Sequence, residues 1–341
     1  MRIIPILAFL FFTLSLISYM QVQEEEARPL TASNIVFQSA DGGQTWQDIS
    51  AGLPQGLDIQ GVFAGGGEIF LGTEKGLYHS GSFATPKWEQ EFLLHGMITD
   101  VFPGRAGLYA SSYGVGLFQN IQGTGIWKNM SLSLADNGVR GVLESADGTI
   151  FVCADTGIFK STDGGNTWKQ VFADGDMILN IVASGEVLIA GSRKGLLRST
   201  DGGEHWEYVL NENMLARKTG LLKDRFVAIL RPENSTFGTA DSTFVGTADS
   251  TKINPNGITN RLCISADGGK TWKRMEQTRD IYDIVQAGDD LFCSFDTGVF
   301  RSSDQGKSWE PVLPSNEMGT FRLAVSGRML YAVSGVGVGG C

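Results

Sequence analysis

The sequence contains few cysteines, histidines and prolines. Four cysteines among 341 residues are too few for a disulfide scaffold, which places many cysteines in a short chain. The three histidines are scattered and no CxxC pair occurs, so no zinc-ligand spacing exists. Nine prolines and the absence of a Gly-X-Y period exclude collagen-like and proline-rich chains, despite 45 glycines. We therefore expect a hydrophobic core to hold the fold, with no metal and no cofactor.

Positive charge is also scarce. Lys and Arg number 27 against 37 Asp and Glu, which gives a net charge of −10. A surface of that sign repels phosphate backbones and anionic lipid headgroups, so nucleic acid is not an expected partner. The hydrophobic share of 42% is far too high for a disordered chain. We expect a folded protein that is a monomer.

A long apolar run occurs at the N-terminus only. Ile3 to Ile17 follows Met1-Arg2 and precedes an acidic stretch. The run is shorter than the ~20 residues of a spanning helix and fits an export signal. We predict an export signal, or an anchor if it is uncleaved, at 1–20 and a linker at 21–33; a buried N-terminal helix is the alternative. The protein would then be exported, periplasmic or extracellular, and would meet a membrane only through this segment.

The tryptophans reveal an internal repeat. They recur about every 40 residues, and one interval is longer by about 25 residues. They are Trp46, Trp88, Trp127, Trp168, Trp206, Trp272 and Trp309. Each repeat reads as four short strands separated by Gly or Asp turns, the pattern of a β-propeller blade.

Five of the tryptophans end an eight-residue motif, Ser-x-Asp-x-Gly-x-Thr-Trp in outline, which we call the Asp turn. The copies are Ser39–Trp46, Ser161–Trp168, Ser199–Trp206, Ser265–Trp272 and Ser302–Trp309. The carboxylate can accept backbone N–H groups of its own loop, glycine supplies a positive φ, and the Trp fills the space between neighbouring sheets. We predict a structural role for Asp41, Trp46, Asp163, Trp168, Asp201, Trp206, Asp267, Trp272, Asp304 and Trp309. Two repeats, Ser80–Trp88 and Asn120–Trp127, keep the Trp but lose the Asp-Gly-Gly core.

The Asp turn resembles the Asp box, or BNR repeat, of sialidases, sortilin-type receptors, xyloglucan-cleaving hydrolases and photosystem II assembly-factor-like propellers. The resemblance covers the chain from about Asn34 to the C-terminus. It implies a propeller in which the motif is a structural turn on the face away from the ligand. It does not by itself imply an activity.

The two ends of the repeat region complement each other. A single strand, Asn34–Gln38, precedes the first Asp turn, and two strands, Phe321–Val325 and Met329–Val333, follow the last Trp. Pairing them completes a blade and removes exposed sheet edges. We predict an all-β fold, a single seven-bladed β-propeller of four-stranded antiparallel blades over 34–341, with an insertion at about 230–259. The insertion either elongates an inner hairpin or reaches over the ligand face.

The cysteines fit this fold as small apolar residues. Cys153, Cys263 and Cys293 fall in predicted strands and are expected to be buried thiols. A bridge from Cys341, the last residue, to one of them is the alternative.

Aligning the innermost strands gives one column of residues at the channel mouth, the default ligand site of a propeller. The column is Gly61, Asp100, Gly141, Asn180, Arg225, Asp283 and Arg322. Its polar members, Asp100, Asn180, Arg225, Asp283 and Arg322, are the candidate ligand-binding residues. Nearby loops add Tyr113, Asp155, Arg193 and Asp296. The alternative is a structural ring whose opposite charges satisfy one another.

Two functions remain open. One is an exported, noncatalytic scaffold that binds a protein or a glycan at the channel face. The other is a sialidase-like or xyloglucanase-like glycoside hydrolase with Asp100 and Asp283 as acid and base, since that chemistry needs two carboxyls ~5 to 10 Å apart. The sequence favours the scaffold. It has no assignable Tyr-Glu nucleophile pair, only Arg28-Pro29 where sialidases have Arg-Ile-Pro, seven blades instead of six, and one propeller where xyloglucan-cleaving enzymes have two. It also shows no Arg cluster like the basic patch of the photosystem II factors.

Overall fold

The computed structural model describes residues 32–81, 86–94, 96–105, 107–121, 124–130, 138–211, 213–232, 260–276, 279–315 and 319–335. The regular secondary structure in these ranges consists of β-strands. None of these ranges holds a helix long and apolar enough to cross a membrane. The predicted export segment at 1–20, nearly all of the linker, residues 233–259 of the insertion and Cys341 lie outside the described residues.

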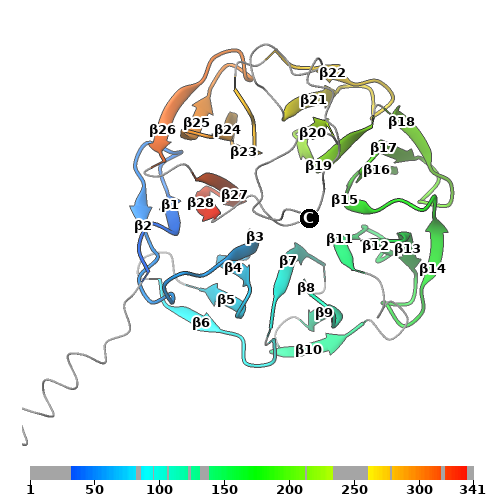
Figure 1. The fold of residues 1–341 in the computed structure, drawn as a ribbon, viewed down its shortest axis with the longest axis horizontal. Coiled ribbons are helices and arrows are strands. Elements are labelled where there is room, and N and C mark those ends of the chain that lie inside the picture. The colour runs from blue at the N-terminus through cyan, green and yellow to red at the C-terminus, as the bar shows by residue number, and fades with distance from the viewer. Residues whose placement is uncertain are drawn as a thin grey trace, which may run out of the picture.

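The strands form seven four-stranded antiparallel sheets, which are arranged radially around a centre (Figure 1). Blade 1 contains β3 (Ile59–Gly65), β4 (Glu68–Thr73), β5 (Gly76–Ser80) and β6 (Trp88–Gln90). Blade 2 contains β7 (Ile98–Pro103), β8 (Leu108–Ser112), β9 (Gly116–Ile121) and β10 (Ile126–Asn129). Blade 3 contains β11 (Val139–Glu144), β12 (Ile150–Ala154), β13 (Gly157–Ser161) and β14 (Lys169–Phe172).

The next three blades repeat this order. Blade 4 contains β15 (Ile178–Ser184), β16 (Val187–Ser192), β17 (Gly195–Ser199) and β18 (Glu207–Asn211). Blade 5 contains β19 (Met214–Leu222), β20 (Arg225–Pro232), β21 (Arg261–Ser265) and β22 (Lys273–Arg274). Blade 6 contains β23 (Asp283–Ala287), β24 (Asp290–Phe295), β25 (Gly298–Ser302) and β26 (Glu310–Pro314). The insertion therefore lies between the second and third strands of blade 5.

Blade 7 joins the two ends of the chain, as predicted. It contains β27 (Thr320–Ser326), β28 (Met329–Gly335), β1 (Val36–Ser39) and β2 (Gln47–Asp48). Val36 pairs with Val333, and the register continues to Ser39 opposite Leu330. Because β1 completes the sheet begun by β27 and β28, the ring closes without a free inner edge. The predicted fold class is confirmed.

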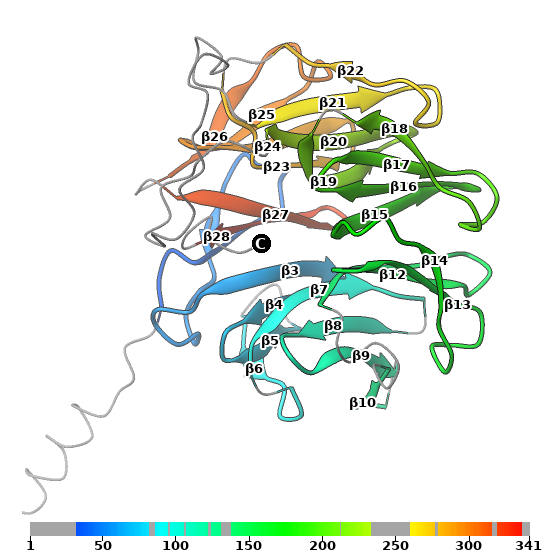
Figure 2. The ribbon, with the colours of Figure 1, turned by 45° about the vertical axis from the view of Figure 1, so that its right-hand side comes forward.

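The alternating strand directions give the propeller two distinct faces. The first strand of every blade lies nearest the centre, as Figures 1 and 2 show for β3, β7 and β27. All first strands start on one face, which we call the mouth face, and this face also carries the turns between second and third strands. The opposite face, the Asp-turn face, carries the Asp turns and the turns between first and second strands.

The second strands are buried because a neighbouring sheet covers each of their faces. All five residues of β12 are buried, and β24 is buried from Leu291 to Phe295. Cys153 and Cys293 lie in these two strands with no exposed surface, and Cys263 is buried in β21. Burial raises the pKa of the Cys153 thiol above its ordinary value. These thiols pack as small apolar side chains.

Each Asp turn satisfies its own backbone, as the copy at Ser161–Trp168 shows. Asp163 Oδ1 accepts the backbone N–H groups of Asn166 at 3.0 Å and Thr167 at 2.9 Å. The Thr167 hydroxyl donates to Oδ2 at 2.7 Å, and the Ser161 hydroxyl accepts the N–H of Gly165 at 2.9 Å. Hydrogen bonds from the backbone and hydroxyl of Thr167, followed by that of Ser161, lower the pKa of Asp163 to about 2. Equivalent carboxylate bonds recur at Asp41, Asp201, Asp267 and Asp304.

In blades 4, 5 and 7 the second glycine of the Asp turn packs on the second strand of the preceding blade. A Cβ on Gly203 would lie 2.4 Å from the ring of Phe151, and one on Gly269 would lie 2.4 Å from Ile189. Both glycines also have a positive φ, at 78°. Only glycine fits these positions, so these two Asp turns pack closely on the blade before them.

Candidate functional site

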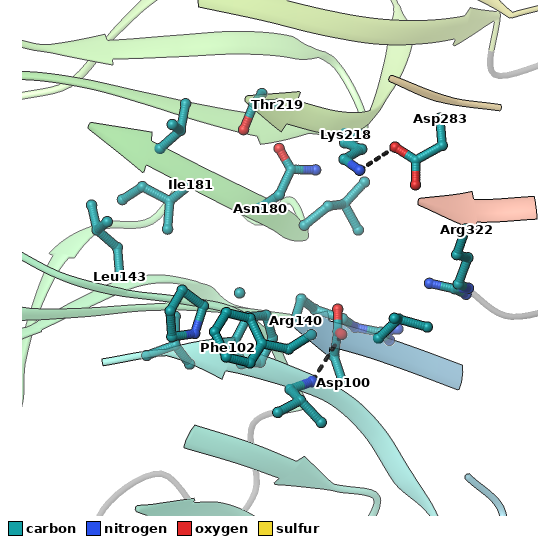
Figure 3. A pocket seen from close by; sticks show the side chains of 18 of the residues that line it. Asp100, Phe102, Arg140, Leu143, Asn180, Ile181, Lys218, Thr219, Asp283 and Arg322 are labelled. Carbon is teal, nitrogen blue, oxygen red and sulfur yellow. Dashed lines mark hydrogen bonds and ion pairs between the residues drawn. The ribbon is translucent and has the colours of Figure 1, made fainter. Parts of the chain in front are cut away.

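The first strands enclose a central cavity of about 740 Å³, to which all seven blades contribute. Figure 3 shows Asp100, Asn180, Lys218, Asp283 and Arg322 gathered in this space from five different strands. The cavity therefore concentrates most of the charged and amide groups predicted to line the channel.

A β-bulge fixes which residue of a first strand reaches the ring. In β3, β7, β11, β15 and β19 the register shifts by one residue directly before the ring position. The residues after these bulges, together with their counterparts in β23 and β27, are Gly61, Asp100, Gly141, Asn180, Lys218, Asp283 and Arg322. Bulges re-aim side chains, and here they place equivalent positions of successive blades at one level.

The prediction for Arg225 was wrong, because this residue begins the second strand of blade 5. Its guanidinium donates from Nη2 to Gln305 Oε1 at 3.2 Å on the Asp-turn face. The apolar run of β20 after Arg225 resembles an inner strand, whereas the true inner strand β19 is more polar. Lys218 occupies the ring position instead. The four-strand count between Trp206 and Trp272 was the signal that an earlier strand, Met214–Leu222, had to come first.

Lys218 forms an ion pair with Asp283, which is only 6% exposed. The dashed line between the labelled side chains of Lys218 and Asp283 in Figure 3 marks this pair. Asp283 Oδ1 also accepts the N–H of Ile284 at 2.7 Å, and Oδ2 accepts the N–H of Leu323 at 2.9 Å. The carboxylate thus binds the inner strands of blades 5, 6 and 7 together, and both of its oxygens are engaged.

Asp100 lies deep in the molecule, although part of its surface lines the cavity. Its Oδ1 accepts the N–H of Val101 at 2.9 Å. Burial raises the pKa of Asp100 to about 6; the positive charge of Arg322 is the largest opposing effect. Arg322 is exposed to the channel and faces the same space (Figure 3). Asp100 therefore changes charge in the pH range just below neutrality.

The small members of the ring allow the inner strands to approach closely. A Cβ on Gly61 would lie 2.5 Å from the Cα of Asp100, so any larger residue would push blades 1 and 2 apart. A Cβ on Gly141 would lie 3.0 Å from the Cα of Asn180. Asn180 donates from Nδ2 to the carbonyl of Ala216 at 2.8 Å, which links blades 4 and 5. Its amide therefore has a structural contact as well as a place on the cavity wall.

The four loop residues predicted beside the mouth all lie in turns between second and third strands on the mouth face. They are Tyr113, Asp155, Arg193 and Asp296. Asp155 pairs with the bulge residue Arg140, whose Nε lies 2.8 Å from Asp155 Oδ1. Burial, and then the nearby charges of Asp280 and Asp296, raise the pKa of Tyr282, which lines the cavity. The rim therefore carries charges of both signs.

An exposed apolar patch lies on the mouth face of blades 1 and 2. We call it the mouth patch; it consists of Phe92, Leu93, Met97, Tyr113 and Val115. Phe92 is 79% exposed and Tyr113 is 77% exposed. The two loops that carry the patch adjoin, since the N–H of Tyr113 donates to the carbonyl of Met97 at 3.0 Å. Large apolar side chains grouped on a surface mark an interaction site. Of these five residues, only Tyr113 was predicted from the sequence.

No group of three or more His, Cys, Asp or Glu within the described ranges is arranged to hold a metal ion.

No protein-family model and no curated protein matches this sequence. Solved structures do match its fold. An ancestral GH74 enzyme has a TM-score of 0.56 at 13% identity and covers 84% of this chain, while this chain covers 41% of the enzyme. The extracellular domain of the putative hybrid two component system BT3049 from B. thetaiotaomicron has a TM-score of 0.54 at 12% identity. The match covers 81% of this chain and 40% of that domain. YCF48 from Cyanidioschyzon merolae has a TM-score of 0.52 at 15% identity. The match covers 78% of this chain and 87% of YCF48.

These likenesses show a β-propeller fold and no more, because one fold hosts many functions. The chain spans less than half of the GH74 enzyme and of the BT3049 domain. The neighbours include an enzyme and an extracellular domain of a bacterial protein, so the function has to be argued from the side chains of this chain.

Proposed function

We propose that this chain is an exported, noncatalytic propeller of the Asp-box type that holds a protein partner on its mouth face. The observation that carries the proposal is the mouth patch. Its five large apolar side chains lie in adjoining loops of the mouth face, and burying them against a partner would supply the favourable free energy of binding. The alternating charges of the rim and ring would then fix the orientation of the partner.

The contacts of Asp283 support binding over hydrolysis. A glycosidase needs two carboxyls that are free to exchange a proton and to attack or activate water. Asp283 is buried, paired with Lys218 and bonded to two backbone N–H groups. Asp100 has a raised pKa that would suit a general acid, but the second carboxyl is already engaged.

The ring also suggests the chemistry of the partner. Arg322 is exposed to the channel; of the two ring carboxylates, Asp100 is half-buried and Asp283 is buried. An acidic side chain or a C-terminal carboxylate entering the mouth would meet Arg322, while apolar side chains of the partner would cover Phe92 and Leu93. A glycan would use Tyr113 as a stacking platform, but Leu93, Met97 and Val115 offer it no hydrogen bonds.

Export is supported by the apolar run Ile3–Ile17 and by the likeness to an extracellular domain. Under this proposal, the propeller contacts a membrane only through this N-terminal segment. The propeller itself would act as a monomer outside the cytoplasm.

The proposal is tested by photo-crosslinking in living cells of the source organism. A benzophenone amino acid replaces Tyr113 in the mouth patch, and a control variant carries it at Leu221, an exposed residue of β19 toward the Asp-turn face. We expect a discrete protein adduct from position 113 that is lost when Leu93→Asp is added, and none from position 221. Equal labelling from both positions, or none from 113, would contradict the proposal. Cleavage of aryl glycosides by the wild type that Asp100→Asn or Asp283→Asn abolishes would establish the hydrolase instead.

A further inference from the structure

The central cavity has an apolar level between the charged ring and the Asp-turn face. All seven first strands, which form the wall of the cavity, lie within the described residues. Successive side chains of a strand alternate in direction, so the residue two places after each ring position falls on the same side of its strand as the ring residue. We call these seven residues the apolar level: Phe63, Phe102, Leu143, Val182, Gly220, Val285 and Ala324. None of them is a polar residue.

Four members of the apolar level, from blades 1 to 4, line the cavity directly and are only half-buried. They are Phe63, Phe102, Leu143 and Val182. Figure 3 shows Phe102 and Leu143 on one side of the space and Arg322 on the other. The volume of about 740 Å³ falls in the range of small-molecule pockets, ~300 to 1,000 Å³. The cavity therefore offers a ligand both an apolar surface and a charged one.

The charge inside the cavity is opposite in sign to that of the whole chain. Five basic residues line the cavity against three acidic ones, whereas the net charge of the protein is −10. The basic residues are Arg105, Arg140, Arg217, Lys218 and Arg322, and the acidic ones are Asp100, Glu144 and Asp283. Positive charge between low-dielectric walls raises the local concentration of anions. The cavity is therefore suited to a negatively charged ligand.

The acidic groups of the cavity are engaged within the protein, whereas one cation is not. Glu144 Oε2 accepts the hydroxyl of Tyr109 and the backbone N–H of Arg105, both at 2.9 Å, and Asp283 is bonded as described above. Arg322 is exposed to the channel and makes no hydrogen bond or ion pair within the described ranges. Its guanidinium is the group that an incoming anion would meet.

We propose that the central cavity binds a small carboxylate with a bulky apolar body, such as an aromatic acid. The carboxylate would pair with the guanidinium of Arg322, which can donate two parallel hydrogen bonds to it. The apolar body would lie against Phe102 and Leu143. Two residues of a strand span about 7 Å, which is comparable to the length of an arylacetate from its carboxylate to the far edge of its ring.

Other small ligands use only part of this cavity. An inorganic anion would reach Arg322 but would leave the apolar level in contact with water. A sugar would find no hydrogen-bonding side chain on the apolar level. A cationic ligand would need a free carboxylate, and those of Glu144 and Asp283 are already engaged. An apolar carboxylate matches both surfaces of the cavity.

The test is equilibrium dialysis of the full-length protein with 2-naphthylacetate, at neutral pH. Its uncharged analogue 2-naphthylacetamide is the matched control, because it has nearly the same shape and cannot form an ion pair. We expect saturable binding of the acid, at least tenfold tighter than that of the amide. Absence of acid binding at millimolar concentration, or equal affinities for acid and amide, would overturn the proposal.

Two variants locate the ligand. Arg322→Met changes an exposed residue and should abolish the preference for the acid over the amide. Leu143→Gln places a polar group on the apolar level and should weaken both ligands at least fivefold, with the circular dichroism spectrum of the wild type retained. An unchanged preference in Arg322→Met would refute the assignment by itself, as would undiminished binding by a folded Leu143→Gln variant.

This site does not rest on the proposed function, and a third variant separates the two. Leu93→Asp alters the mouth patch, so it should abolish the partner adduct and leave the affinity for 2-naphthylacetate unchanged. Loss of acid binding in Leu93→Asp would place the naphthyl group on the mouth patch and would contradict the proposed cavity site. Loss of the adduct alone would support both proposals.

Discussion

The ion pair between Lys218 and Asp283 joins the inner strands of blades 5 and 6 within the channel. Asp283 is buried and also accepts two backbone N–H groups, one of them from blade 7. The side chain of Asp283 therefore connects three adjacent blades. It also leaves Arg322 as a cation exposed to the channel from the next blade.

Removing the lysine should destabilise the protein more than an ordinary surface change. Lys218→Met leaves a buried carboxylate without its counter-charge, so we expect the free energy of unfolding to fall by about 2 kcal/mol. Adding Asp283→Asn should restore part of the loss. Urea unfolding at neutral pH measures both. The matched control is Lys223→Met, whose partner Asp289 is 95% exposed; its effect should stay below about 1 kcal/mol. Equal losses for the two lysines would contradict this account of Asp283.

The closest approach in the ring gives a second prediction. Gly61→Ala places a Cβ 2.5 Å from the Cα of Asp100, and the inner strands of blades 1 and 2 must separate to admit it. We expect a loss of about 2 kcal/mol in the free energy of unfolding. Gly220→Ala is the control, because the nearest atom to its Cβ, on Val227, is 3.5 Å away. If both changes are neutral, the packing around Gly61 is looser than described.

The raised pKa of Asp100 predicts how stability varies with pH. The folded protein holds this proton up to about pH 6, whereas the ordinary pKa of an aspartate side chain is 3.8. Between those values the folded state binds more protons than the unfolded state, so stability falls as the pH rises. Asp100→Asn removes this penalty. We expect the variant to gain about 2 kcal/mol relative to the wild type between roughly pH 4 and pH 7.

Chemical unfolding of both proteins at these two pH values measures the effect. A difference in stability that is the same at both pH values would show that Asp100 is not perturbed. A second check is Arg322→Met, which removes the largest opposing charge and should raise the pKa of Asp100 further in an NMR titration.

The Asp turns should respond to acid in the opposite sense. Hydrogen bonds lower the pKa of Asp163 to about 2 in the folded protein. Its stabilising effect is therefore present above the ordinary aspartate pKa of 3.8 and is lost as the pH falls toward 2. Asp163→Asn should lower the melting temperature at neutral pH and match the wild type near pH 2. The exposed hairpin residue Asp224 supplies a control, since Asp224→Asn should leave the melting temperature unchanged. A loss for Asp163→Asn that persists at low pH would argue against this role of the carboxylate.

The regular spacing of the tryptophans was sufficient to predict seven blades and the shared blade 7, because each blade repeats the same alternation of apolar strands and turns. The ring position in blade 5 was not predictable in the same way. Its second strand begins at Arg225 and is more apolar than the inner strand that carries Lys218, so hydrophobicity pointed to the wrong strand. A bulge before Lys218 further obscured the alignment.

The mouth patch illustrates a different limit. The exposure of Phe92 and Leu93 depends on how their loop is held against that of Tyr113, and no pattern in the sequence shows this contact.

The most direct test of the central claim is amide hydrogen exchange of the protein with and without the partner captured at position 113. The account predicts that the partner slows exchange in the loops around Phe92 and Tyr113 and leaves the β19–β20 turn at Lys223 unchanged. Protection confined to the Asp-turn face, with the loops around Phe92 and Tyr113 exchanging as in the free protein, would contradict it.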